Sequence, residues 1–189
     1  MDKERMKVVL DTNIFVNPDS RRIWGETPQQ ALNNFLELLS KKNNIKCFMP
    51  PSIYEELTKF IDTQAISSKI ILIERKPPSK YEINIPSLLF YEFVEKMRNR
   101  INKGLRVGEK YVRKALLSGK EEELIKSLRE EYRLALREGI IDSKEDVDLL
   151  ILAKELSAYL ATSDNGLIFW ADKLGISCIS TQEIKTIIE

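Results

Sequence analysis

The sequence contains no histidine, only two cysteines and no long apolar run. Without histidine the chain cannot build a Ser-His-Asp or Cys-His triad, a histidine-based ribonuclease site or an imidazole-ligated metal centre. Cys47 and Cys178 are too far apart for a zinc knuckle and lie in apolar, strand-like segments, so we interpret them as buried thiols. Any catalysis must therefore rest on carboxylates, lysines, hydroxyls or a metal ion held by oxygen atoms.

The apolar segments are short. None approaches the roughly 18 residues that a membrane-spanning helix requires, and residues 1–5 lack the apolar core of a signal peptide. We therefore expect a cytoplasmic protein with no membrane partner. Its 189 residues suffice for one compact α/β domain with a sizeable insertion.

The outer parts of the chain alternate apolar strands with amphipathic helices, which predicts a parallel sheet covered on both faces. We expect strands at 7–10, 45–49, 159–162 and 176–179, and either a strand or a helix tail at 70–73. We expect helices at 28–42, after Pro50-Pro51, at 142–156, at 167–174 and at 181–188, the last capped by Thr181.

The middle of the chain, residues 86–139, predicts a long helical hairpin without a strand. Apolar residues recur there at helical spacing, Gly104 and Gly108 are expected to interrupt the first helix, and residues 118–120 are expected to form the turn. This segment carries 13 Lys and Arg against 9 Asp and Glu, although the whole chain has a net charge of only +1. We therefore divide the chain into an α/β domain (1–85 and 140–189) and an inserted basic arm (86–139).

Carboxylates follow the predicted strands and begin the helices beside them. Asp11 and Asp164 each stand after a strand, and Glu56 lies one turn into a helix. Strand ends and the following helix starts share one edge of an open parallel sheet, so these acids should converge. Several ionised carboxylates in one pocket require a cation, and oxygen ligands favour Mg²⁺, with Mn²⁺ as the alternative. The other members of this set are Asp142, Asp146 and Asp148.

Each of these acids also has a structural interpretation. Asp142 with Glu145, or Ser143 with Asp146, fits a helix capping box. Asp148 could complement the helix dipole, and Asp164 could serve a turn. Only one of Glu55 and Glu56 can face the sheet edge, because Leu57 belongs to the core. The sequence leaves these alternatives open.

Four segments together resemble the four-acid signature of PIN-domain nucleases: Val8-Val9-Leu10-Asp11-Thr12-Asn13, Pro51-Ser52-Ile53-Tyr54-Glu55-Glu56-Leu57, Ser143-Lys144-Glu145-Asp146-Val147-Asp148 and Ala161-Thr162-Ser163-Asp164. With the inserted hairpin and the length near 190 residues, the whole chain resembles the small RNA-free ribonuclease P family (HARP). That resemblance implies a PIN-like fold with an arm and removal of the 5′ leader of precursor tRNA without an RNA subunit. It also implies homo-oligomers built from dimers, up to a dodecamer, in which the arm serves assembly and tRNA binding.

By the same resemblance, the catalytic positions are Asp11, Glu56, Asp142, Asp146 and Asp164, with Asp148 as a further candidate. Asp11, Glu56, Asp146 and Asp164 would be the metal ligands. Glu56 is chosen over Glu55 because the PIN motif places its acid directly before an apolar residue. Two alternatives are a toxin-type PIN endoribonuclease acting on other RNAs and a non-catalytic RNA-binding accessory subunit; the intact acid set argues against the second, since acids repel RNA.

The second helix of the arm carries a stripe of basic residues at spacings of three and four. Like charges so arranged repel one another, and RNA phosphates would supply the counter-charge. We therefore expect this stripe to bind RNA by shape and phosphate contacts, with subunit contacts or a solvated surface as the alternatives. Its members, which we call the basic stripe, are Lys126, Arg129, Arg133 and Arg137.

Overall fold

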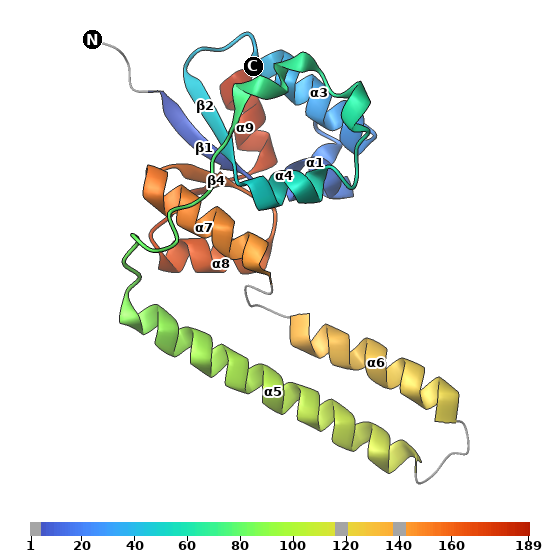
Figure 1. Ribbon diagram of the computed structural model, residues 1–189. Coiled ribbons are helices and arrows are strands. Elements are labelled where there is room, and N and C mark those ends of the chain that lie inside the picture. The colour runs from blue at the N-terminus through green and yellow to red at the C-terminus, as the bar shows by residue number, and fades with distance from the viewer. Residues whose placement is uncertain (1–4, 116–120, 138–142) are drawn as a thin grey trace. The chain divides into compact units, whose positions relative to one another are not determined.

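The computed structural model describes residues 5–115, 121–137 and 143–189. These residues form two compact units, which Figure 1 shows along the chain. The sheet unit lies within residues 1–84 and 143–189, and the hairpin unit within residues 85–142. In the described ranges, no helix is both long and apolar enough to cross a membrane.

The sheet unit is built on five parallel strands in the order β3-β2-β1-β4-β5. This confirms the predicted α/β fold with a central parallel sheet. The chain runs from β1 to β2 on one side and returns to β4 on the other, so a topological switch point lies between β1 and β4. The strands are β1 Met6–Leu10, β2 Ile45–Met49, β3 Ile73–Arg75, β4 Tyr159–Ala161 and β5 Cys178–Ile179.

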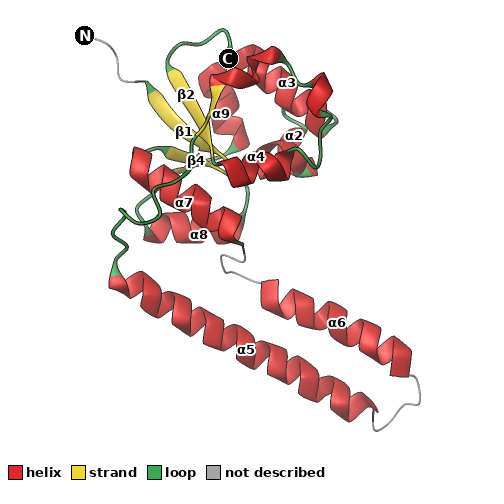
Figure 2. Ribbon diagram, viewed as in Figure 1, coloured by secondary structure: helices red, strands yellow, loops and turns green. Residues whose placement is uncertain are grey.

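Helices cover both faces of this sheet, as Figure 2 shows. Val8, Val9 and Leu10 are consecutive and fully buried, which requires cover on each side because successive side chains point to opposite faces. α7 and α8 contact each other, and Lys185 of α9 bonds to the Ile23 carbonyl before α3. The helices are α1 Asn13–Val16, α2 Pro18–Arg21, α3 Pro28–Leu39, α4 Pro51–Leu57, α7 Lys144–Leu156, α8 Asn165–Lys173 and α9 Thr181–Ile188.

Several predicted element ends were wrong, and side-chain caps explain two of them. α7 begins at Lys144 rather than 142 because Ser143 is its N-cap. α9 is capped by Ser180 rather than Thr181, since Ser180 and Glu183 form a reciprocal capping box. The segment predicted at 70–73 divides into a short 3₁₀ helix, Ser68–Leu72, and the strand β3, with another 3₁₀ turn at Thr63–Ala65.

The hairpin unit consists of α5 (Ser87–Ala115) and α6 (Glu121–Arg137). The prediction that Gly104 and Gly108 interrupt the first helix was wrong, because α5 passes through both. Gly104 instead lets Tyr132 of α6 approach: a Cβ atom at Gly104 would meet the Tyr132 ring at 2.7 Å. The predicted turn at 118–120 and the predicted helix end at Gly139 lie outside the described residues.

Candidate active site

The first two acids meet at the switch point of the sheet. Leu10 of β1 is in register with Ala161 of β4, and the Asp11 N–H donates to the Ala161 carbonyl at 3.0 Å. Asp11 and Asp164 therefore leave neighbouring strands at the same edge, where open α/β sheets bind ligands.

The Asp11 carboxylate is buried and held by four donors from three residues. Thr162 Oγ1 donates to Oδ2 at 2.6 Å and Asn13 Nδ2 to the same oxygen at 3.1 Å. The Asn13 N–H donates to Oδ1 at 3.2 Å, and Thr12 Oγ1 lies 3.4 Å from it. Burial raises the pKa of Asp11, these hydrogen bonds oppose the rise, and the nearby Asp164 charge adds to it. The result is a fixed, poorly solvated carboxylate.

Asp164 has a structural role at the start of α8, and its charge lies near Asp11. It is the N-cap of α8, where Oδ1 accepts the Leu167 N–H at 2.9 Å, and its own N–H donates to Thr162 Oγ1 at 3.0 Å. Thr162 therefore links the Asp164 backbone to the Asp11 carboxylate. Capping leaves Asp164 Oδ2 outside the α8 hydrogen bond.

α4 brings a third carboxylate to this edge. Of its two adjacent glutamates, Glu55 is exposed and Glu56 is half-buried. The pKa of Glu56 is raised by burial and then by the Asp11 charge, while a hydrogen bond with Thr12 lowers it. Glu56 is therefore a neighbour of Asp11 and Thr12, although the two segments are about 45 residues apart in the sequence.

The start of α7 contributes a residue that the sequence analysis missed. Glu145 adds to the rise in the Glu56 pKa, which places its charge beside the cluster. We had interpreted Glu145 only as a capping partner of Asp142. Its position one turn before Asp148 on the helix could have pointed to this role, because the two residues share a face.

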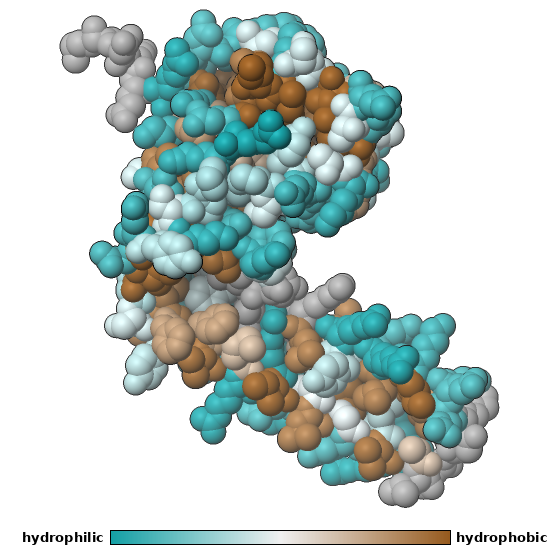
Figure 3. Space-filling view, viewed as in Figure 1, coloured by the Kyte–Doolittle hydropathy of each residue, from teal (hydrophilic) through white to brown (hydrophobic). Residues whose placement is uncertain are grey.

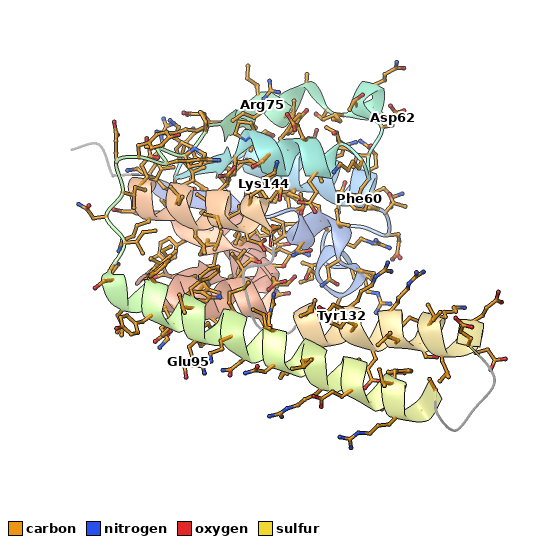
Figure 4. The ribbon with its side chains drawn as sticks, turned by 60° about the horizontal axis from the view of Figure 1, so that its bottom comes forward. Phe60, Asp62, Arg75, Glu95, Tyr132 and Lys144 are labelled. Carbon is orange, nitrogen blue, oxygen red and sulfur yellow. The ribbon has the colours of Figure 1, made fainter. Side chains whose placement is uncertain are left out.

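The acids that we predicted at and before the start of α7 differ in their surroundings. Asp146 is half-buried in the first turn, and its N–H donates to the capping Ser143 Oγ at 3.0 Å. Asp142 lies outside the described residues. Asp148 is buried, but its partners are Ser52 and Lys80 rather than Asp11. Figure 4 shows Lys144 at the start of α7, and Phe60 just beyond α4.

Comparison with known proteins identifies the family to which this chain belongs. Residues 7–189 match the model of the PINc-domain ribonucleases. The chain is 47% identical over 184 residues to the RNA-free ribonuclease P of Thermodesulfovibrio yellowstonii, a match that covers 97% of this chain and 93% of that protein. The chain therefore belongs to the RNA-free ribonuclease P family of PINc-domain ribonucleases. Identity is 43% over 187 residues to the Pyrococcus abyssi RNA-free ribonuclease P, covering 97% of this chain and 92% of that protein. It is 41% over 191 residues to the Haloarcula marismortui protein of the same name, covering 91% and 85%.

Membership of this PIN ribonuclease family confirms the suspected resemblance, and the chain is an endoribonuclease. PIN nucleases generally depend on divalent metal ions, and the donor chemistry of the acid cluster fits such an ion. Every candidate donor is a carboxylate or hydroxyl oxygen, and the mutual repulsion of Asp11, Asp164 and Glu56 would be relieved by a cation. In the described part of the chain, however, no three acidic or cysteine side chains are arranged closely enough to hold an ion together.

The basic stripe lies on the hairpin unit. Lys126, Arg129 and Arg133 are exposed on α6, while Arg137 ends that helix. Elsewhere on the hairpin, Lys110 of α5 forms an ion pair with Glu131 of α6 at 2.6 Å.

Proposed function

We propose that this protein is a divalent-metal-dependent endoribonuclease that removes the 5′ leader of precursor tRNA without an RNA subunit. The observation that carries this proposal is the acid cluster at the switch point, found in a chain that matches proteins named RNA-free ribonuclease P over nearly its whole length. Mg²⁺ is the expected ion and Mn²⁺ the alternative.

In this proposal Asp11, Glu56, Asp146 and Asp164 hold the metal, and Asp142 completes the catalytic set. A bound divalent ion supplies charge neutralisation for the phosphodiester and lowers the pKa of the attacking water. The chain contributes orientation: Thr162 and Asn13 fix both Asp11 oxygens, so this carboxylate is preorganised. Cleavage by water leaves a 3′-hydroxyl on the leader and a 5′-phosphate on the mature tRNA.

The basic stripe then docks the folded part of the tRNA through its phosphates. Exposed arginines such as Arg129 and Arg133 suit this role, because binding depends on phosphate geometry rather than on base sequence. Lys126, Arg129, Arg133 and Arg137 would thereby select the position of the cut.

We further propose a cytoplasmic homo-oligomer built from dimers, up to a dodecamer, in which α5 supplies a subunit contact. Apolar side chains at spacings of three and four form an exposed stripe along this helix, and Figure 3 shows apolar groups gathered over the hairpin. Such a surface is typical of a protein interface. Tyr111 of the same helix is buried and does not belong to this stripe. The stripe is formed by Phe90, Val94, Met97, Ile101 and Leu105, and Val112 continues it two turns further along α5.

Light scattering tests the assembly. The full chain at micromolar concentration should be larger than a monomer, and the double variant Ile101→Glu/Leu105→Glu should be smaller. Ile71→Glu, at an 83% exposed residue of the sheet unit, is the matched control and should keep the wild-type mass. A monodisperse wild-type monomer would contradict this part of the proposal.

Cleavage of an end-labelled precursor tRNA tests the function. With Mg²⁺ we expect one cut, at the mature 5′ end. Cuts in the anticodon loop or elsewhere in the mature tRNA would favour a toxin-type PIN endoribonuclease. Binding without any cleavage would favour an accessory subunit.

A further inference from the structure

Asp148 is the most deeply buried acid of α7, and both of its oxygens are already occupied. Oδ2 accepts the hydroxyl of Ser52 at 2.8 Å, and Oδ1 lies 2.6 Å from Lys80 Nζ. The Asp148 side chain is 10% exposed and the Lys80 side chain 53% exposed, so the ion pair is buried at the carboxylate and open at the ammonium. This carboxylate joins three segments: the start of α4, the first half of α7 and the loop that follows β3.

The same two helices carry a second pair of side chains one turn away. Glu56 follows Ser52 by four residues on α4, and Glu145 precedes Asp148 by three on α7, so each pair shares a helix face. Glu145 raises the pKa of Glu56 by its charge, so these two acids are neighbours. α4 and α7 are in contact. Because Ser52 pairs with Asp148 and Glu56 lies near Glu145, the two helices run antiparallel at this contact. The Ser52–Asp148 hydrogen bond holds the two helices together, whereas the charges of Glu56 and Glu145, one turn away, repel each other.

The loop that carries Lys80 is fixed at a second point of α7. Glu155 accepts the N–H of Ser79 at 2.8 Å and pairs with Lys76 at 2.5 Å. Ser79 directly precedes Lys80, so this contact sets the backbone from which the Lys80 side chain reaches Asp148. The loop therefore lies along α7 from its last turn toward its first.

We infer that Asp148 is a positioning residue: with Ser52 and Lys80 it forms a clamp that holds α4 against α7 and so keeps Glu56 beside the α7 acids. This inference rests on the proposed function. Each oxygen of Asp148 has a partner from a different segment: Oδ2 accepts the Ser52 hydroxyl of α4, and Oδ1 pairs with the Lys80 ammonium group of the loop after β3. The clamp opposes the separation that repulsion between Glu56 and Glu145 favours.

A double-mutant cycle separates this clamp from a direct role in catalysis. If Asp148 acts through Lys80, then Asp148→Asn and Lys80→Met should each lower kcat for precursor-tRNA cleavage about 10- to 100-fold, with KM nearly unchanged. The double variant should be no worse than either single variant within about threefold, because both break one interaction. Lys80→Arg keeps the charge and should restore most of the activity.

Lys46→Met is the matched control. Lys46 forms a comparably exposed ion pair with Glu74, at 2.7 Å, on strands β2 and β3 of the same unit. Its loss should leave kcat within about twofold of wild type, as expected for a surface pair. Lys80 is half-exposed, so Lys80→Met tests the clamp even if Asp148→Asn fails to fold.

Binding of Mn²⁺ to the RNA-free protein, measured by isothermal titration calorimetry, supplies a readout that does not depend on cleavage. Asp148→Asn and Lys80→Met should both still bind Mn²⁺, with equal, modest losses of affinity, whereas Asp11→Asn should abolish binding. The inference is overturned if Asp148→Asn abolishes Mn²⁺ binding while Lys80→Met binds like wild type, because Asp148 is then a ligand. It is also overturned if neither variant changes kcat or Mn²⁺ affinity. A wild-type protein that binds Mn²⁺ but does not cut precursor tRNA would refute the proposed function alone, and the Mn²⁺ affinities would still decide about the clamp.

Discussion

The sheet unit and the hairpin unit differ in how far they bury their apolar side chains and in the surroundings of their charged side chains. The sheet unit buries three consecutive residues of β1 completely, and its buried Asp11 is satisfied by neighbouring donors. The hairpin unit leaves apolar residues exposed along α5, with Phe90 and Val112 both above 60% exposed. It also presents arginines on α6 that lie open to solvent.

This difference indicates that the two units have different functions. A unit with a complete core can hold several carboxylates in fixed positions, which chemistry on a phosphodiester requires. Two helices alone bury little of their outward faces, and the exposed apolar side chains of α5 are the surface on which the proposed assembly rests. We infer that the sheet unit cuts, and that the hairpin unit binds RNA and other subunits.

Substitution of the acids should separate cleavage from RNA binding most clearly. Asp11→Asn, Asp146→Asn and Asp164→Asn should each lower the cleavage rate at least about a hundredfold, because each removes a proposed metal ligand. RNA affinity, measured by filter binding, should stay close to wild type since the hairpin is unchanged. Full activity of Asp146→Asn at a normal melting temperature would refute a shared metal site that includes this residue.

Substitution of the basic stripe should have the opposite effect, a loss of RNA binding with the metal site preserved. Arg129→Glu/Arg133→Glu should weaken precursor-tRNA binding roughly 10- to 100-fold at physiological salt, and reduce the salt dependence of log affinity by about two. The metal site and the light-scattering mass should be preserved. Lys41→Glu/Lys42→Glu makes the same change in net charge on the sheet unit, before β2 and away from the acid edge, and should leave affinity near wild type. A loss of mass before any loss of affinity would assign the stripe to subunit contacts instead.

Two glycines of α5 test how the hairpin is packed. Gly104→Ala should destabilise the hairpin by about 1–3 kcal/mol, because the new methyl group meets the Tyr132 ring at 2.7 Å. Gly108→Ala has no atom within 4 Å of its added Cβ and should stabilise the helix by up to about 1 kcal/mol. Hydrogen exchange of α5 amides measures both effects. Equal effects of the two substitutions would contradict the close contact at Gly104.

The smallest effect concerns the pH dependence of the sheet unit. Burial and Asp11 raise the pKa of Glu56 above its usual value, so its ionised form disfavours folding. This unfavourable contribution grows as the pH rises from the unfolded pKa through the folded pKa and is complete above it. Without divalent ions, Glu56→Gln should therefore melt higher than wild type at pH 7, by a few degrees at most, and this gain should vanish near pH 4. An unchanged difference from pH 4 to pH 7 would contradict the raised pKa.

Much of the fold could be predicted from local patterns. The apolar strands and amphipathic helices of the sheet unit follow from periodicity, and Asp11 and Asp164 follow from their places after strands. Leu57 showed that only one of Glu55 and Glu56 can face the sheet edge, and the PIN motif, which places its acid directly before an apolar residue, favoured Glu56. These features depend on neighbours within a few residues in the sequence.

The remaining features depend on contacts between distant segments. The need for a glycine at position 104 depends on the ring of Tyr132, a residue 28 positions later. The burial of Tyr111 likewise depends on α6. The Asp148 clamp requires Lys80, from a loop with no recognisable pattern, and the proximity of Glu145 to Glu56 requires the packing of α4 on α7. No periodicity in a single sequence reports such pairs.

Cleavage in H₂¹⁸O tests most directly the central claim, that the acid edge of the sheet unit hydrolyses precursor tRNA at its mature 5′ end. The wild-type protein, precursor tRNA and Mg²⁺ are incubated in labelled water, and both products are analysed by mass spectrometry. We predict a mature tRNA whose 5′-phosphate carries one ¹⁸O atom and a leader that ends in an unlabelled 3′-hydroxyl. A leader ending in a 2′,3′-cyclic phosphate, or a label at any other position of the tRNA, would contradict the claim.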